Sequence, residues 1–192
     1  SVEELMNRAE SMKLDSEGVR RAFEHPSAPV YADQTSRWLP NSDEVHDMLL
    51  EAIQHFLPDN GHVLDLGAGT GRLTKLFLDR FPESTAVAAD YSTTMRNSAT
   101  DALAEYGDRV TIIELDMFSS AWTNAAIGFD VVISAFAIHH GESNEVYRSV
   151  YQRIYEALKP GGLFINLDHV AGEDRAGSIT NAQKWRDFLD QD

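Results

Sequence analysis

Three glycines near the middle of the chain are the residues most able to admit a small molecule. Gly67, Gly69 and Gly71 stand at alternate positions directly after an apolar run that ends at Leu66. A ligand-binding loop needs glycine because a Cβ atom would obstruct both a sharp turn and the close approach of a ligand to the backbone. An ordinary strand-to-helix turn would explain one glycine, but not three at this spacing. The loop therefore predicts a ligand site.

The spacing of this loop differs from that of a dinucleotide-binding loop. The dinucleotide pattern is G-x-G-x-x-G, and counting from Gly67 places Arg72 where the third glycine would stand. Asp65 lies on the apolar run just before the loop and would set a negative charge beside the ligand. A carboxylate there suits a ligand amino group better than a phosphate, so a nicotinamide dinucleotide is disfavoured.

Two further acids, Asp90 and Asp116, each follow a short apolar run. Asp90 lies nineteen positions after Gly71, and an acid at that offset can accept hydrogen bonds from both hydroxyls of a ribose. Asp116 could accept a hydrogen bond from the exocyclic amine of an adenine, while the backbone N–H of Met117 meets a ring nitrogen. The alternatives are that Asp90 caps the next helix, although Ser92 is also available for capping, and that Asp116 is only a loop residue.

These residues depend for their positions on alternating strands and helices. Nearly continuous apolar strands that are joined by helices are typical of a parallel sheet covered on both faces. Right-handed crossovers then give a doubly wound α/β fold. We expect strands at 62–66, 85–90, 109–115, 129–135 and 163–168, and helices at 41–57, 72–81, 93–106, 144–158 and 179–189, with a weaker helical pattern at 116–128.

The segment before residue 41 has a different pattern. Apolar residues from Val2 to Met12 fall on one helical face, and residues 24–40 contain three prolines, which favour an irregular connector. We therefore divide the chain into an N-terminal helix and lid-like segment at 1–40 and a Rossmann-like ligand-binding domain at 41–192, within one globular unit.

Composition narrows the classes of partner and location. The chain has 16 Lys and Arg against 31 Asp and Glu, a formal net charge of −15, which repels phosphate backbones and anionic lipids and so disfavours nucleic-acid and membrane partners. It has no cysteine, which excludes disulfides, thiolate metal ligands and thiol catalysis. No stretch approaches the length of a membrane span and the N-terminus has no apolar segment, so we expect a cytoplasmic protein.

Together with FDVVISA at 129–135 and LKPGG at 158–162, the acids and the glycine loop resemble the class I S-adenosylmethionine-dependent methyltransferases in order and spacing. The similarity spans 61–170, and AIHH at 137–140 is similar to the small-molecule branch that includes ubiquinone and menaquinone methyltransferases and carboxy-S-adenosylmethionine synthases. The resemblance implies a three-layer, mostly parallel sheet of strand order 3-2-1-4-5, with C-terminal strands 6 and 7 absent or truncated. It implies a methyltransferase that takes S-adenosyl-L-methionine and a small-molecule acceptor and releases S-adenosyl-L-homocysteine.

The same resemblance implies roles for individual residues in binding this cofactor. Tyr91 and Met95 would flank the adenine, Ser134 would lie near the sulfur, and Arg37 would pair with the carboxylate of the cofactor from a segment that folds over it. The backbone of the glycine loop would face the methionine part, with Asp65 near its amino group. The whole implied set is Tyr31, Arg37, Asp65, Gly67, Ala68, Gly69, Gly71, Asp90, Tyr91, Met95, Asp116, Met117, Ser134 and Ala135.

His139 and His140 follow the fourth strand and are the candidate catalytic residues, beside the expected methyl group. Either could act as a general base toward a hydroxyl or amine nucleophile. The alternative is that one packs or hydrogen-bonds within the loop and the other only lines the pocket. Two adjacent histidines are a poor chelate without a nearby carboxylate, so we expect no metal.

Other functions remain open on this sequence. The chain could bind S-adenosylmethionine without methyl transfer, as a carboxy-S-adenosylmethionine synthase or a regulatory module would, or it could be a nicotinamide-dependent dehydrogenase, which shares the fold type. Without the last two strands of the family, the fifth strand would lie at an exposed edge that invites pairing. The last helix, another partner or a second copy in a homodimer could cover that edge.

Overall fold

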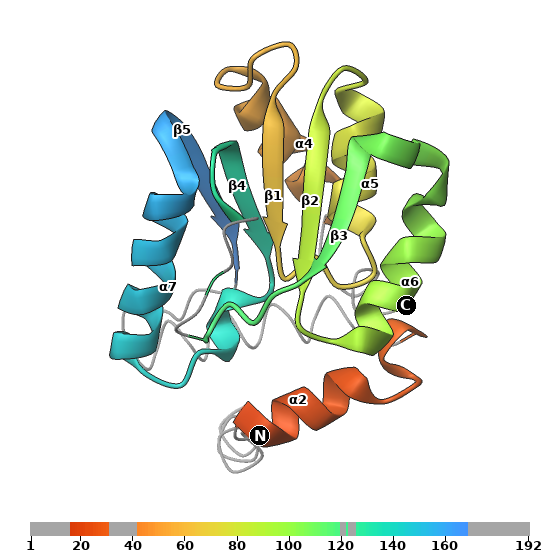
Figure 1. The fold of residues 1–192 in the computed structure, drawn as a ribbon, viewed down its shortest axis with the longest axis vertical. Coiled ribbons are helices and arrows are strands. Elements are labelled where there is room, and N and C mark those ends of the chain that lie inside the picture. Colours follow the sequence, from red (N-terminus) through yellow and green to blue (C-terminus); the bar gives the residue numbers. More distant parts are fainter. Residues whose placement is uncertain (1–15, 31–41, 120–121, 123–125, 169–192) are drawn as a thin grey trace.

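A five-stranded parallel sheet forms the centre of the computed structural model, which describes residues 16–30, 42–119, 122 and 126–168. Its strand order is β3-β2-β1-β4-β5, with every neighbouring pair parallel (Figure 1). This arrangement confirms the predicted doubly wound α/β fold. For the first four strands the predicted ranges agree with the observed ones to within one residue. The strands are β1 (His62–Leu66), β2 (Thr85–Asp90), β3 (Val110–Glu114), β4 (Phe129–Ala135) and β5 (Leu158–Leu167).

Helices lie on both faces of this sheet, as the apolar character of its strands requires. The α-helices are α2 (Ser16–Glu24), α4 (Ser42–Gln54), α5 (Arg72–Arg80), α6 (Thr93–Leu103) and α7 (Asn144–Ala157), and two short 3₁₀ helices are η1 (Ala104–Arg109) and η3 (Ile138–His140). Among the helices that the structure describes, none is both long enough and apolar enough to cross a membrane.

Alternate side chains of each strand enter two separate apolar cores, because successive residues of a strand point to opposite faces. On one face, strand residues such as Val63 and Ile133 pack with Ile53 of α4, Phe77 of α5 and Leu103 of α6. On the opposite face, the neighbouring strand positions pack with α7 and with the segment after β3. Members of this second core include Leu64, Val87, Val132, Val150 and Ile154. Both cores hold the carboxyl ends of the strands in fixed positions.

Strand β5 begins at Leu158, five positions before the predicted start at 163. Leu158 pairs with Phe129 and Leu163 pairs with Val131, so 159–162 of β5 bulge opposite the single residue Asp130. Gly161 in this bulge has a φ of +81°, and the ammonium of Lys159 lies 2.9 Å from both carboxylate oxygens of Asp130. The Pro-Gly-Gly sequence has the pattern of a turn, which is why sequence periodicity places the strand later.

Helix α2 is an element that the sequence analysis did not predict. It lies beyond the carboxyl ends of the strands in Figure 1, next to the start of α6. The Ser92 hydroxyl donates to the carbonyl of Phe23 at 2.8 Å, and the Thr94 hydroxyl donates to that of Glu24 at 2.9 Å. The helices predicted at 2–12 and 179–189 lie outside the described residues, and the described part of 116–128 contains no α-helix.

Candidate functional site

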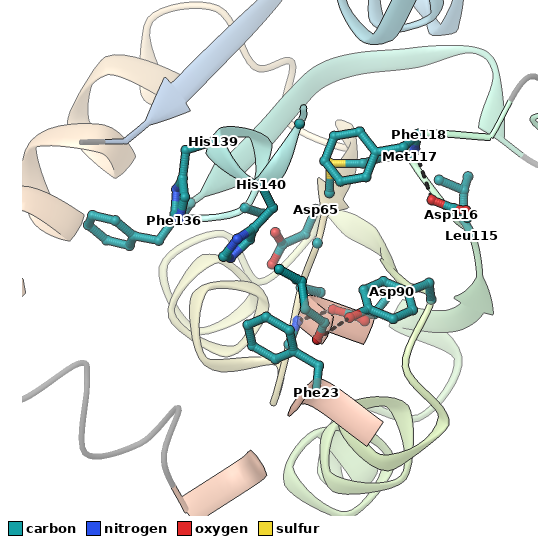
Figure 2. Close-up of a pocket in the computed structure, with 18 of the residues that line it drawn as sticks. Phe23, Asp65, Asp90, Leu115, Asp116, Met117, Phe118, Phe136, His139 and His140 are labelled. Atoms are coloured by element: carbon teal, nitrogen blue, oxygen red, sulfur yellow. Dashed lines mark hydrogen bonds between the residues drawn. The ribbon is translucent and has the colours of Figure 1, made fainter. Parts of the chain in front are cut away.

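A cavity of about 590 Å³ opens at the carboxyl ends of the strands. Its wall is built from the loop after β1, the ends of β2 and β4, the segment after β3, η3 and helix α2. Figure 2 shows Asp90 and Asp116 on one side of this cavity and His139 and His140 on the other. The predicted residues that line it are Asp65, Gly67, Ala68, Gly69, Asp90, Tyr91, Asp116, Met117, Ala135, His139 and His140.

Three residues of the predicted set are absent from the described lining. Gly71 begins helix α5 in the left-handed conformation, and Met95 is 1% exposed in the protein interior. The hydroxyl of Ser134 donates to the carbonyl of Leu66 at 2.7 Å, so this side chain joins β4 to β1. Tyr31 and Arg37 lie outside the described residues.

The three glycines of the loop serve different purposes, although all have positive φ. A Cβ on Gly67 would lie 2.5 Å from the Cβ of Ala137, and one on Gly71 would lie 2.9 Å from Leu103 Cδ1. A Cβ on Gly69, whose φ is +55°, would meet no protein atom within 4 Å. Gly67 and Gly71 therefore allow close packing, whereas Gly69 borders the open space of the cavity.

Asp90 joins the glycine loop to the start of helix α6. One carboxylate oxygen accepts the N–H of Gly69 at 2.8 Å and the other accepts the N–H of Ser92 at 2.9 Å. The cap of α6 is Ser92, whose hydroxyl accepts the N–H of Met95 at 3.1 Å, so capping does not account for Asp90. Burial raises the pKa of Asp90 above its usual value, and the two N–H donors oppose that shift.

Asp65 is a buried acid below the glycine loop. It is 1% exposed, and the Thr74 hydroxyl donates to its carboxylate at 2.6 Å. Burial is the main cause that raises the pKa of Asp65 to about 7; the hydrogen bond from Thr74 opposes this shift and the nearby charge of Asp90 adds to it. Because an adjacent cation favours the ionised form of a carboxyl, Asp65 is suited to a ligand that carries an ammonium group.

Asp116 is held from two sides at the opposite end of the same wall. Its Oδ1 accepts the N–H of Phe118 at 3.0 Å, and its Oδ2 is paired with the guanidinium of Arg20 from α2. The guanidinium of Arg20 also lies 5.1 Å from the ring centre of Tyr91. A charged side chain and an aromatic ring thus flank the acid that was predicted to recognise a base.

The residues that α2 brings to the cavity, Val19, Arg20 and Phe23, were missed by sequence reasoning. Two signals could have found this helix: the shared face of Val19, Ala22 and Phe23, and the charges of Glu17 in the first turn and Arg21 in the last. The ring of Phe23 makes an edge contact with His140, with ring centres 5.4 Å apart. Arg72, which stands where a dinucleotide-binding loop has its third glycine, also lines the cavity.

The two histidines occupy different environments. His139 places Nδ1 2.5 Å from Oδ1 of Asp168, a residue that was not predicted. His140 is half-buried beside Phe23 and the His139 ring, and burial followed by the proximity of His139 lowers the pKa of His140 to about 4. His140 is therefore neutral at physiological pH. Within the described ranges, no three His, Asp or Glu side chains are grouped to hold a metal ion.

A family model described as "Methyltransferase domain" matches residues 63–162, just over half of the chain. The matched segment includes the glycine loop, Asp90, Asp116 and both histidines.

Among curated proteins, the chain is similar to the carboxy-S-adenosyl-L-methionine synthase of Chromohalobacter salexigens. The two are 25% identical over 171 residues, which cover 87% of this chain and 62% of the synthase. The chain spans less than two thirds of the length of this relative and of the corresponding synthase from Campylobacter lari.

Two solved structures have the same fold. An O-methyltransferase family protein from Burkholderia thailandensis superposes with a TM-score of 0.62 and 23% identity. The superposition covers 91% of this chain and 48% of the Burkholderia chain. The glycopeptide N-methyltransferase MtfA complexed with sinefungin superposes with a TM-score of 0.52 and 32% identity. The superposition covers 60% of this chain and 50% of the MtfA chain.

Proposed function

The chain belongs to the methyltransferase domain family, and from that premise we propose that it transfers a methyl group from S-adenosyl-L-methionine to a small-molecule acceptor. The observation that carries this proposal is the grouping of Asp65, Asp90 and Asp116 around one cavity. The spacing of these acids along the strand ends suits the amino group, the sugar and the base of one nucleoside. The N-methyltransferase that binds sinefungin supports the same class of ligand.

The residues present fit this cofactor in a specific orientation. We propose that Asp90 accepts hydrogen bonds from the ribose hydroxyls while it keeps the loop in place through Gly69 N–H. Asp116 and the Met117 backbone would bind the edge of the adenine, beside Tyr91. The methionine part would lie over Gly69, where the space next to the backbone is open, with its ammonium near Asp65.

The protein would contribute to this reaction chiefly by aligning the acceptor with the methyl group and by excluding water. When bound, S-adenosyl-L-methionine supplies an electrophilic methyl group. Phe23, Phe118 and Phe136 line the cavity and give part of its wall an apolar character. His139 and His140 lie on the acceptor side, where a neutral imidazole can take the proton of a hydroxyl or amine.

The N-terminal segment is proposed to act as a lid, with residues 1–40 covering the domain at 41–192. Helix α2 supports this proposal because Arg20 and Phe23 already form part of the cavity wall. We propose no nucleic-acid or membrane partner, because the net charge of −15 repels phosphate backbones and anionic lipids. We also propose a cytoplasmic location, because the sequence has no cysteine and so no disulfide. A homodimer is proposed because β5 lies at an edge of the sheet.

A second function is favoured by one specific observation. The curated relative that covers 87% of this chain is a carboxy-S-adenosyl-L-methionine synthase. The chain would then use the same cofactor site without transferring a methyl group to an acceptor.

Incubation with methyl-labelled S-adenosyl-L-methionine and a pool of small metabolites separates these functions. We expect label in a small product, together with release of S-adenosyl-L-homocysteine. Tight binding of the cofactor with no labelled product would instead favour the second function. Failure to bind the cofactor at all would refute both.

A further inference from the structure

Asp168 holds His139 through two separate hydrogen bonds at the end of β5. Its Oδ1 lies 2.5 Å from the ring Nδ1 of His139, and its Oδ2 accepts the backbone N–H of the same residue at 3.1 Å. The side chain of Asp168 is 9% exposed, whereas that of His139 is 35% exposed. A largely buried carboxylate therefore forms hydrogen bonds with a histidine that lines the cavity.

This geometry selects one tautomer of the neutral imidazole. An ionised carboxylate can only accept hydrogen bonds, so neutral His139 must carry its proton on Nδ1. The lone pair of the ring then lies on Nε2. Such a carboxylate also stabilises the imidazolium that forms when Nε2 takes a proton.

His140 lacks this arrangement even though it is the adjacent residue. Its ring packs against Phe23 and against the ring of His139, with centres 5.4 Å and 4.1 Å apart. Its burial opposes a positive charge, as its lowered pKa shows. His140 is therefore suited to forming an apolar wall, and the two histidines divide the roles that the sequence left open.

We propose that Asp168 is a positioning residue that sets His139 as the proton acceptor for an acceptor molecule bearing a hydroxyl group. This inference rests on the proposed function and deepens it. The hydroxyl proton moves to Nε2 of His139 as the oxygen forms a bond to the methyl carbon. The C–S bond breaks, and its electron pair returns to sulfur as S-adenosyl-L-homocysteine leaves.

The surrounding loop offers a matched control, because the Tyr147 hydroxyl bonds to backbone carbonyls of the same segment. Its hydroxyl donates to the carbonyl of Gly141 at 2.8 Å and lies 3.2 Å from that of His139. Tyr147→Phe therefore loosens the loop but leaves the Asp168 contact with the imidazole in place.

Asp168→Asn makes a sharper change than deletion of the side chain. The backbone N–H of His139 must still face an acceptor, so the single amide oxygen turns toward it. The NH₂ group then faces Nδ1, which has to become the acceptor. The proton of the neutral ring moves to Nε2, and the proton-accepting lone pair on that nitrogen is lost.

The test is long-range ¹H–¹⁵N correlation spectroscopy of the histidine rings at a series of pH values, with His139→Gln assigning the resonance. We expect neutral His139 to be the Nδ1–H tautomer in the wild type and in Tyr147→Phe, and the Nε2–H tautomer in Asp168→Asn. An Nε2–H tautomer in the wild type, or no change in Asp168→Asn, would overturn the inference.

Transfer of the labelled methyl group from S-adenosyl-L-methionine to hydroxyl-bearing members of the metabolite pool provides the second measurement. We expect Asp168→Asn to slow the initial rate by about 10²-fold or more, the usual range for loss of a general base, with Tyr147→Phe close to wild type. An unchanged rate in Asp168→Asn would refute the role of His139 as base. Binding of S-adenosyl-L-homocysteine, measured by titration of the same samples, does not depend on the tautomer of His139. Loss of this binding in the wild type would therefore refute the proposed function and not the role of Asp168.

Discussion

At the scale of single residues, Gly69 and Gly107 form a natural pair for testing the glycine loop. Their φ values are +55° and +53°, and a Cβ on either would meet no protein atom within 4 Å. Alanine at either position costs about 1–2 kcal/mol of stability or more, because positive φ strains a side chain. Only Gly69→Ala places a methyl group beside the cavity. We expect calorimetry to show much weaker S-adenosyl-L-homocysteine binding for Gly69→Ala and wild-type binding for Gly107→Ala; equal affinities would remove Gly69 from the site.

Asp65 predicts an unusual dependence of stability on pH. Its pKa of about 7 in the folded chain exceeds the ordinary value of 3.8, so between these values the folded state binds more protons than the unfolded state. The free energy of unfolding therefore falls as pH rises from about 4 to 7 and then levels. The side chain in Asp65→Asn does not titrate, so this fall in the free energy of unfolding is absent. Denaturant titrations should show the free energy of unfolding of the variant rising relative to that of wild type over that range, by an amount on the order of a few kcal/mol.

The control for Asp65 is Asp130, whose pKa shifts in the opposite direction. Burial raises the pKa of Asp130, but hydrogen bonds from Lys159 and from the His62 N–H outweigh burial and leave the pKa lowered. Asp130→Asn should therefore lose stability relative to wild type at neutral pH, with the difference shrinking as pH falls through the lowered value. Parallel pH profiles for the two variants would contradict the assignment of Asp65.

The acids were easier to predict from sequence than their partners. Asp65, Asp90 and Asp116 lie on or directly after parallel strands, whose carboxyl ends share one edge, so the strand pattern alone brings them together. The pairs Arg20 with Asp116 and His139 with Asp168 join residues 96 and 29 positions apart. No local pattern specifies such contacts, because they depend on how separate elements pack.

At the scale of elements, Ser92 has two functions that Ser143 allows us to separate. Both hydroxyls cap a helix, accepting N–H groups of Met95 and Val146, but only Ser92 also donates to α2 through the Phe23 carbonyl. Either change to alanine should cost about 0.5–2 kcal/mol of unfolding free energy. Hydrogen exchange of residues 16–24 should accelerate only in Ser92→Ala. Equal exchange in both variants would show that this bond does not hold α2 in place.

Elements that pack on a face of the sheet were predicted closely, whereas helix α2 and the start of β5 were missed. Strand β2 and helix α7 carry apolar residues at the periods of strand and helix, and their observed bounds match the expected ones within a residue. Helix α2 has an amphipathic pattern, but it precedes the alternating strands and helices, and its apolar side chains contact a ligand cavity and the start of α6 instead of a sheet face. The early start of β5 depends on a bulge opposite Asp130, which periodicity does not reveal.

At the scale of the whole molecule, alternating strands and helices with right-handed crossovers predict a doubly wound sheet but allow more than one strand order. The order with β1 at the centre was expected from the resemblance to the class I methyltransferases. The observed order β3-β2-β1-β4-β5 has this form. Chemical specificity is less accessible, because the cavity wall includes α2 and η3, whose positions depend on how separate elements pack.

Calorimetric titration with S-adenosyl-L-homocysteine and with a nicotinamide dinucleotide tests the central claim most directly. We expect one molecule of the nucleoside to bind per chain and no binding of the dinucleotide. Asp90→Asn should weaken the nucleoside affinity by about 10-fold or more, as loss of a charged hydrogen-bond acceptor does, while Asp130→Asn should bind like wild type. Preferential binding of the dinucleotide, or wild-type affinity in Asp90→Asn, would contradict the assignment of this cavity.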